Sequence, residues 1–179
     1  MRFAGMQSFG FTLIDLITTL SVLCVLLGIG LPSFTGQIHA TRVKTATQHL
    51  LESLELTRSQ AVFSNNRTTI RKQNNWEDGW EVFIDKNNDG IPNGNEKTIQ
   101  KHDKLNGVRI IANNPVKNYV SFIGSGEGRN ANGSNSAGAF QAGTFTVCPQ
   151  GKGKGYELIL ARGGRVRTHE VSEQDCAAI

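Results

Sequence analysis

Five cationic side chains near the C-terminus give the clearest chemical signal in this chain of 179 residues. Arg162, Arg165 and Arg167 surround a Gly-Gly pair, and Lys152 and Lys154 alternate with glycines a few residues earlier. On a strand, Arg165 and Arg167 point to one side, because side chains alternate. Guanidinium groups fit phosphate oxygens through paired hydrogen bonds. These side chains could together form a site for an anionic ligand such as DNA that contacts the backbone rather than the bases, so that binding would be independent of sequence and weakened by salt.

A solvated strand edge is the alternative to this site. Arginines on an edge strand discourage pairing with other sheets. Acidic side chains close by in the sequence could also neutralise part of the charge; they are Glu157, Glu170, Glu173 and Asp175. The formal net charge of +4 is compatible with an anionic partner, but net charge alone does not identify one.

The segment from Asp85 to Glu96 is a second group of residues that could bind a ligand. Asp85, Asn87, Asp89 and Glu96 occupy oxygen-donor positions of a calcium-loop template, and Gly90 stands at its sharp turn. A strand rather than a helix is expected before the segment, unlike the helix-loop-helix of an EF-hand. Asn, Asp and Gly also favour tight turns. The segment is therefore interpreted as a long hairpin turn, with a calcium site as the alternative.

No residue pattern in the chain predicts catalysis or a bound cofactor. The four histidines lack the spacing of metal ligands, no serine lies in a nucleophile-elbow motif, and no nucleotide-binding glycine pattern follows a strand. The histidines are His39, His49, His102 and His169. The sequence thus predicts neither an enzyme nor a metal site.

The three cysteines divide into two groups. Cys24 lies in an apolar run and is interpreted as a small packing residue. Cys148 and Cys176 lie in the C-terminal part, where an oxidising compartment would allow a disulfide between them. If the domain is exported, we expect this bridge; two free thiols are the alternative.

The elements that must position these side chains begin with an apolar run near the N-terminus. Between Leu16 and Thr41 there is no Asp, Glu, Lys or Arg. A membrane-crossing helix needs about 20 mostly apolar residues, so residues 11–34 are predicted to form a transmembrane and assembly helix. Asp15 is the exception in this run, because a carboxylate in a membrane helix invites a partner.

Residues 35–66 are predicted to continue this helix as an amphipathic half. Apolar residues recur there at helical spacing, and charged residues occupy the opposite face. The apolar stripe comprises Val43, Ala46, Thr47, Leu50, Leu51, Leu54 and Ala61. The opposite face carries Arg42, Lys44, Glu52, Glu55 and Arg58. The stripe is expected to pack on a sheet.

A β-rich globular domain is predicted for residues 67–179, where the period of the apolar residues changes to two. The expected strands are Thr68–Lys72, Trp80–Asp85, Thr98–Gln100, Val108–Ile111, Tyr119–Ile123, Gly143–Val147, Tyr156–Leu160 and Gly164–Thr168. Residues 124–143, called the glycine tract below, are expected to form a mobile loop. The predicted fold class is α+β, with a long N-terminal helix, membrane half plus amphipathic half, packed on antiparallel β-sheet.

The N-terminus resembles that of type IV pilins and pseudopilins. Gly10 and Phe11 are followed by three residues, an acidic residue and the apolar run. In this family a prepilin peptidase removes a leader that ends in Gly, and the new N-terminal residue is methylated. The resemblance implies a leader at residues 1–10, cleavage between Gly10 and Phe11, and methylation of Phe11. Asp15 stands where the family usually has a Glu that pairs with a neighbouring subunit's terminal amine, so Asp15 is expected to serve assembly.

The rest of the chain resembles the FimT/GspH branch of this family. The hairpin from Asp85 to Glu96 is similar to a feature of that branch. Gly164-Arg165-Val166-Arg167 is similar to the G-R-x-R motif of FimT-like minor pilins, which bind DNA during natural transformation, and Arg162 matches a further basic position. The resemblance implies a pilin-like fold and a minor pilin that takes up extracellular DNA without a cofactor. The alternative is a GspH-like pseudopilin of type II secretion, a structural subunit that does not bind DNA.

Partners and location follow from the same resemblance. The expected partners are DNA, other pilins of the filament, the prepilin peptidase and the inner membrane. The protein is expected to cross the inner membrane once before assembly, with its globular domain in the periplasm. After assembly it is expected in a pilus at the cell surface.

Overall fold

The structure is a computed structural model that describes residues 11–134 and 137–178, with the backbone alone described for residues 29–35. The predicted leader, residues 1–10, lies outside the described residues. The predicted cleavage residue Gly10 lies outside them too, so its processing stays a prediction of the sequence.

The chain divides into two compact units, residues 1–37 and 38–179, and each is described by itself. One helix, α1 (Leu13–Ser64), contributes to both units. The helix ends at Ser64, two residues before the predicted end at residue 66. Asn65 directly after it adopts a φ of 50°, the left-handed conformation that commonly ends a helix.

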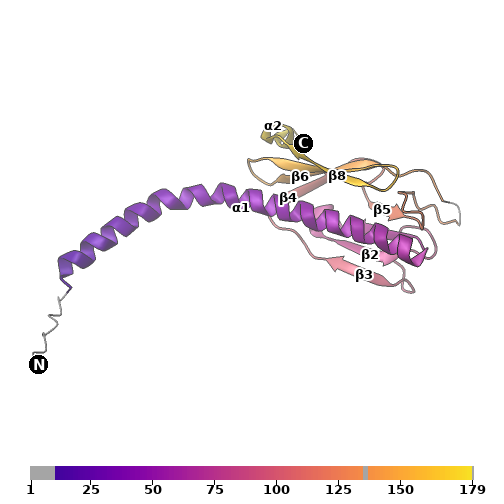
Figure 1. Ribbon diagram of the computed structural model, residues 1–179, viewed down its shortest axis with the longest axis horizontal. Coiled ribbons are helices and arrows are strands. Elements are labelled where there is room, and N and C mark those ends of the chain that lie inside the picture. The colour runs from indigo at the N-terminus through magenta and orange to yellow at the C-terminus, as the bar shows by residue number, and fades with distance from the viewer. Residues whose placement is uncertain (1–10, 135–136, 179) are drawn as a thin grey trace, which may run out of the picture. The chain divides into compact units, whose positions relative to one another are not determined.

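Apolar side chains of α1 lie at the surface throughout the described part of the first unit (Figure 1, indigo end). They are Leu13, Ile14, Leu16, Ile17, Leu20, Val22, Leu23, Val25, Leu26 and Leu27. Among the residues that the structure describes, no helix combines the length and the apolar content that crossing a membrane requires. The prediction that residues 11–34 span a membrane is therefore not confirmed. Asp15, Thr18 and Thr19 interrupt the apolar surface of this helix.

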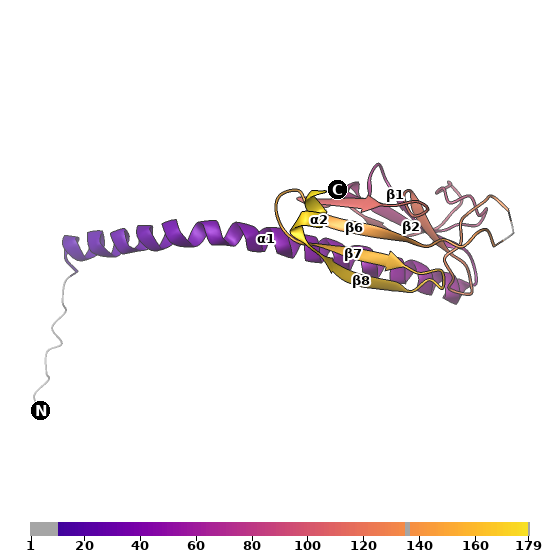
Figure 2. The same ribbon diagram turned by 90° about the horizontal axis from the view of Figure 1, so that it is seen from above.

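Eight strands, found within residues 68–171 of the described chain, form two four-stranded antiparallel sheets. The elements are β1 (Thr68–Lys72), η1 (Trp76–Asp78), β2 (Trp80–Ile84), β3 (Thr98–His102), β4 (Val108–Ala112), β5 (Tyr119–Phe122), β6 (Gly143–Pro149), β7 (Gly155–Leu160), β8 (Val166–Val171) and α2 (Glu173–Ala177). The strand orders are β3-β2-β1-β5 and β4-β6-β7-β8. Figure 1 shows the second half of α1 lying along both sheets, and Figure 2 shows it beneath β7 and β8.

The core of the second unit joins α1 to both sheets. Leu50 and Leu54 of α1 are fully buried in one apolar cluster with Ile70 and Trp80 of the first sheet and Phe145 of the second. Burying a side chain of this size stabilises a fold by about 1.5–3 kcal/mol. The predicted stripe is confirmed at the buried positions Val43, Ala46, Thr47, Leu50, Leu54 and Ala61. The α+β class, with a helix packed on antiparallel sheets, is confirmed for this unit.

Several elements differ from the sequence-based expectation. β8 begins after the predicted start at Gly164, because Gly164 and Arg165 belong to the turn before the strand. The short helices η1 and α2 are not among the elements expected from the sequence. Ser172 is the N-cap of helix α2, and its hydroxyl accepts a hydrogen bond from Asp175 N.

Residues of the glycine tract that the structure describes are hydrogen-bonded to the rest of the domain, in contrast to the expected mobile loop. Arg67 is 6% exposed, and all three of its side-chain nitrogens donate hydrogen bonds, two of them to carbonyl groups of the tract. Nη1 donates to Ser121 Oγ at 2.7 Å and to Arg129 O at 2.9 Å. Nη2 donates to Ala137 O at 3.1 Å, and Nε donates to Asn88 Oδ1 at 3.0 Å. A single buried guanidinium therefore supplies the order that apolar side chains cannot supply in this tract.

Candidate nucleic-acid interface

The hairpin between β7 and β8 carries the three predicted arginines. Ala161 and Arg165 close it, because Ala161 N donates to Arg165 O at 2.9 Å and Gly164 N donates to Ala161 O at 2.9 Å. Gly164 adopts a φ of 79°, the left-handed conformation that three-residue hairpin loops use before the second strand. Residues 161–165 are called the arginine turn below.

Arg165 and Arg167 face away from the core. Arg167 lies opposite Ile159 of β7, and the neighbours of Ile159, Leu158 and Leu160, are buried. Residues that face each other across antiparallel strands share one side of the sheet. Arg167 therefore lies on the outer side, and Arg165, which belongs to the turn before the strand, is exposed. That these two arginines share a side stays a prediction of the sequence.

The arginine side chains of the hairpin are open to solvent and have no competing partner among the residues that the structure describes. Arg162, Arg165 and Arg167 are all exposed. Across the described ranges of the chain, none of the three takes part in an ion pair or a side-chain hydrogen bond. Each guanidinium carries five N–H donors. The hairpin can therefore offer three guanidiniums to an anionic ligand.

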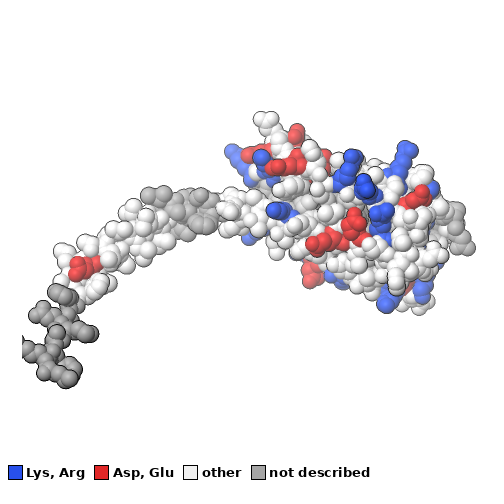
Figure 3. Space-filling model, in the orientation of Figure 1, with Lys and Arg blue, Asp and Glu red and all other residues white. Residues whose placement is uncertain are grey.

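Lys152 and Lys154 lie at the opposite end of β7 from the arginine turn. β7 runs from Gly155 to Leu160, and a rise of about 3.3 Å per residue separates its ends by about 17 Å. Lys154 Nζ also lies 3.0 Å from Glu170 Oε1. The structure therefore does not gather the five predicted cations into one patch. Figure 3 shows Lys and Arg atoms spread over this domain with acidic atoms between them.

Arg58 of α1 lies beside the arginine turn. Its Nε donates to Gly126 O at 3.0 Å, and its Nη2 donates to Gly163 O at 3.4 Å. A Cβ added to Gly164 would overlap Gly126 O and lie 3.0 Å from Arg58 Nε. Arg58 was expected on the solvent-facing side of the helix, but it is half-buried. The arginine turn, α1 and the start of the glycine tract pack against one another at this point.

The predicted disulfide is present at the other end of β7. Cys148 and Cys176 are bonded, and they share a small buried cluster with Val171. A Cβ added to Gly155 would lie 2.5 Å from Cys176 Sγ, which places the bridge against the first residue of β7. The bridge thus fastens α2 to the sheet at the end away from the arginine turn. Cys24 is free and exposed in the first unit.

The carboxylates of the calcium-like segment bind their own backbone. Asp85 is 1% exposed and accepts hydrogen bonds from Thr69 Oγ1 at 3.0 Å, Asp89 N at 3.1 Å and Gly90 N at 3.0 Å. Glu96 likewise accepts from two backbone N–H groups of the segment. Burial raises the pKa of Asp85. These contacts support the interpretation of the segment as a hairpin turn.

Two of the predicted histidines meet across the domain. His49 Nδ1 of α1 lies 3.0 Å from His102 Nε2 of β3, and the His102 ring stacks on Trp80 with centroids 4.3 Å apart. Within the part of the chain that the structure describes, no group of three or more His, Cys, Asp or Glu side chains could hold a metal ion. The histidine pair connects helix and sheet.

Asp15 caps its own helix. Its Oδ2 accepts from Thr12 N at 3.1 Å and from Thr12 Oγ1 at 2.6 Å, while Asp15 N donates to Thr12 Oγ1 at 3.3 Å. This reciprocal arrangement is a capping box, which satisfies N–H groups at the start of a helix. The predicted role of Asp15 in subunit assembly stays a prediction. Pairing with another subunit would have to compete with these internal bonds.

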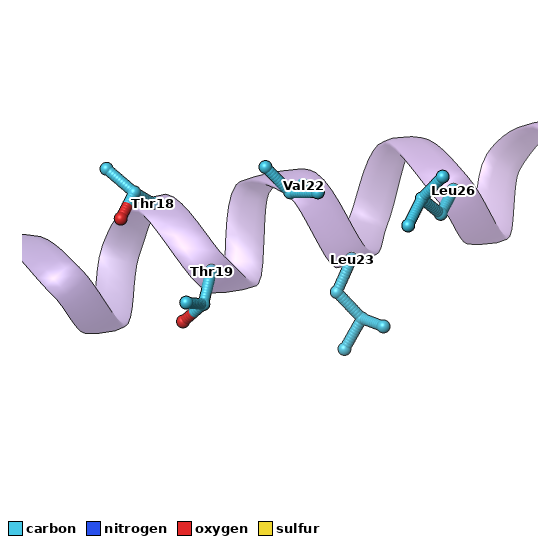
Figure 4. A pocket seen from close by; sticks show the side chains of 5 residues that line it. All are labelled: Thr18, Thr19, Val22, Leu23 and Leu26. Carbon is cyan, nitrogen blue, oxygen red and sulfur yellow. The ribbon is translucent and has the colours of Figure 1, made fainter.

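A shallow hollow on the same helix has walls from that helix alone. It is lined by Thr18, Thr19, Val22, Leu23 and Leu26. Figure 4 shows these side chains pointing outward from successive turns rather than into an enclosed space. A surface of this kind can pack against an apolar partner but cannot enclose a small ligand.

Comparison with known proteins places the second unit in a family. Residues 46–164 match the family model described as Type II transport protein GspH. The chain belongs to the GspH family. The match covers the second half of α1 and most of the sheets and ends at Gly164, so Arg165 and Arg167 lie just beyond it. A search of curated protein sequences finds no match.

Solved structures of pilin-like proteins share the fold of this GspH-family chain. The type IV minor pilin FimU of Pseudomonas aeruginosa matches with a TM-score of 0.55 and 19% identity, over 73% of this chain and 90% of FimU. The minor pseudopilin EpsH from the Type 2 Secretion System of Vibrio cholerae matches with a TM-score of 0.51 and 15% identity, over 72% of this chain and 96% of EpsH. At these identities the likeness shows the fold alone. With the family match, it confirms the predicted resemblance to FimT/GspH-like minor pilins and pseudopilins.

Sequence reasoning missed two arginines that shape this region. Arg58 follows the pattern of a solvent-facing helix residue, and no local signal marks its contacts with two distant loops. Arg67 lies at the start of a strand, where a buried guanidinium is unexpected. The glycines of these two loops are the sequence feature that could have indicated this contact. Gly126 and Gly164 both adopt a positive φ, and they lie where two backbone segments approach closely.

Proposed function

We propose that this GspH-family chain is a minor type IV pilin that binds extracellular DNA for uptake in natural transformation. Arg162, Arg165 and Arg167 would make the contacts. The observation that carries the proposal is that these three exposed guanidiniums lie around one hairpin end without a partner among the described residues. Such groups match phosphate oxygens and leave the base sequence unread.

The number of arginines sets the expected strength and salt dependence. Three phosphate contacts on duplex DNA correspond to a slope of about −2.7 in a plot of log affinity against log salt. Binding of this type is weak, with dissociation constants of about 10⁻⁴ to 10⁻⁶ M at physiological salt. Several subunits or several pilins on one DNA molecule would raise the overall affinity through effective concentration.

Fluorescence anisotropy of a random-sequence DNA duplex tests the proposal. The full chain would be purified in detergent and titrated at several salt concentrations, beside a variant with Arg165→Gln and Arg167→Gln. We expect the wild type to bind with a slope near −2.7. The variant should bind more weakly, with a slope nearer −0.9, because two phosphate contacts are lost.

Lys152→Gln with Lys154→Gln is the matched control, since it removes the same charge about 17 Å away along β7. If DNA binds locally at the arginine turn, this control should keep most of the wild-type slope of log affinity against log salt. Equal loss in both double variants would instead indicate attraction by net charge. No binding by the wild type at low salt would remove the DNA-uptake proposal.

The second candidate is a GspH-like pseudopilin of a type II secretion system, structural and without DNA binding. The family match and the fold shared with EpsH favour it. It predicts that the variant with Arg165→Gln and Arg167→Gln supports secretion as well as the wild type does.

Both candidates involve assembly with other pilins and a location in a pilus or the cell envelope. In this proposal the prepilin peptidase cleaves between Gly10 and Phe11, and Phe11 is then methylated. Mass spectrometry of the N-terminal peptide from the native host tests both steps.

Apolar side chains such as Leu20 and Leu23 of α1 would pack against neighbouring subunits, and Asp15 would set their register. The inner-membrane stage before assembly stays a prediction of the sequence.

A further inference from the structure

Arg58 connects three segments that are distant in the sequence. Its guanidinium binds the carbonyl oxygen of Gly126 in the glycine tract and that of Gly163 in the arginine turn. These residues lie 68 and 105 positions away from Arg58. One side chain of α1 therefore contacts the backbone of two separate loops.

The loops have little space to rearrange around this contact. Gly126 adopts a φ of 81°, and a Cβ there would lie 3.3 Å from Arg58 Nε and 3.2 Å from Val62 Cγ2. Gly164, with a φ of 79°, approaches Gly126 O so closely that it has no room for a side chain. Both glycines thus bring backbone against the Arg58 guanidinium. The contact is part of the packing of this end of the domain, not a passing interaction of an exposed arginine.

We propose that Arg58 is a positioning residue for DNA binding: it holds the arginine turn in the conformation that presents Arg162 and Arg165 together with Arg167. This inference rests on the proposed function, since it assigns Arg58 a role at the same site. Two of its three nitrogens are engaged with carbonyl oxygens, so Arg58 acts through the turn rather than as a phosphate ligand. A turn held in place before DNA arrives loses less conformational freedom on binding.

Arg58→Lys separates this role from a simple contribution of charge. Lysine keeps the positive charge, but its single ammonium lacks the planar fork that reaches both carbonyl groups. If Arg58 only added charge, the lysine variant would bind DNA like the wild type. If Arg58 positions the turn, the lysine variant should bind about as poorly as Arg58→Gln.

Two measurements on the full chain in detergent test the proposal. Hydrogen–deuterium exchange reports on the turn without DNA, through the amide protons of Ala161 and Gly164 that are bonded within it. We expect Arg58→Lys to speed exchange in the arginine turn about tenfold and to leave exchange in β6 unchanged. Anisotropy with a DNA duplex should show a rise of about three- to tenfold in the dissociation constant.

Arg42→Lys is the matched control, because Arg42 is an exposed arginine on the same helix. It lies 16 residues earlier in the chain, about 24 Å along the axis. This control should change neither measurement.

Three outcomes would overturn the positioning role. They are unchanged exchange in the turn of Arg58→Lys, faster exchange throughout the core strands, and faster exchange in the turn with unaltered DNA affinity. If the wild type itself fails to bind DNA, the proposed function and the DNA-binding part of this inference fall together. The exchange data then still decide whether Arg58 holds the turn.

Discussion

Gly164→Ala should disable the DNA site without removing any charge. The φ of 79° at this position costs an alanine about 1–2 kcal/mol, and the added methyl group would overlap Gly126 O. To relieve the overlap, the arginine turn must move away from the glycine tract and break its bond with Arg58. A hydrogen bond to a charged group contributes about 1.5–3 kcal/mol. We therefore expect the free energy of unfolding to fall by about 2.5–5 kcal/mol.

DNA affinity should fall by about tenfold in the same variant. Ordering one released residue on binding costs about 1–2 kcal/mol, and 1.4 kcal/mol corresponds to a factor of ten. Anisotropy titrations at fixed salt measure the affinity, and urea denaturation measures the stability. The neighbouring Gly163→Ala is the control, because a Cβ there meets no atom within 4 Å. Equal stability and affinity in the two alanine variants would refute the argument that close backbone packing shapes the turn.

Three further predictions concern the rest of the domain. Removing the disulfide with Cys148→Ser and Cys176→Ser should lower the free energy of unfolding by about 3–4 kcal/mol, because the bridge closes a loop with a sequence separation of 28. DNA affinity should stay unchanged, and unaltered thermal stability would contradict this prediction. Arg67→Ala should cost about 3–5 kcal/mol and open the glycine tract to limited proteolysis, since it breaks a buried charged network. Asp85 has a raised pKa, so its contribution to stability is largest at low pH and declines as pH rises above its ordinary value of 3.8. In Asp85→Asn, the free energy of unfolding measured by urea denaturation should no longer show this decline with pH. If it declines as steeply as in the wild type, Asp85 is not the cause.

The linear pattern of the sequence was sufficient for the strands of the second unit and for the buried face of its long helix. Alternation of apolar residues located the strands, and helical spacing identified the buried stripe around Leu50 and Leu54. These signals are local, because burial on one face imposes a period of 2 or 3.6 on the residues themselves. The cysteine pair was also predictable, since only two cysteines lie in the C-terminal part.

Contacts between distant loops were not predictable from the same pattern. The glycine tract has too few apolar side chains to suggest order, yet Arg67 and its carbonyl partners hold it in place. Lys154 was grouped with the arginines because the residues are near in sequence. A strand of six residues separates them in space, and Glu170 pairs with the lysine.

By itself, the sequence determined the family, the order of helix and strands, and the presence of three arginines around a Gly-Gly pair. Only the tertiary structure shows that Lys152 and Lys154 lie apart from the arginines and that Arg58 donates a hydrogen bond to the arginine turn. It also shows that Gly164 has no room for a side chain. The physical reason is that residue type and spacing set local conformation and burial, whereas the partner of a polar group depends on which segments the fold brings within about 3 Å.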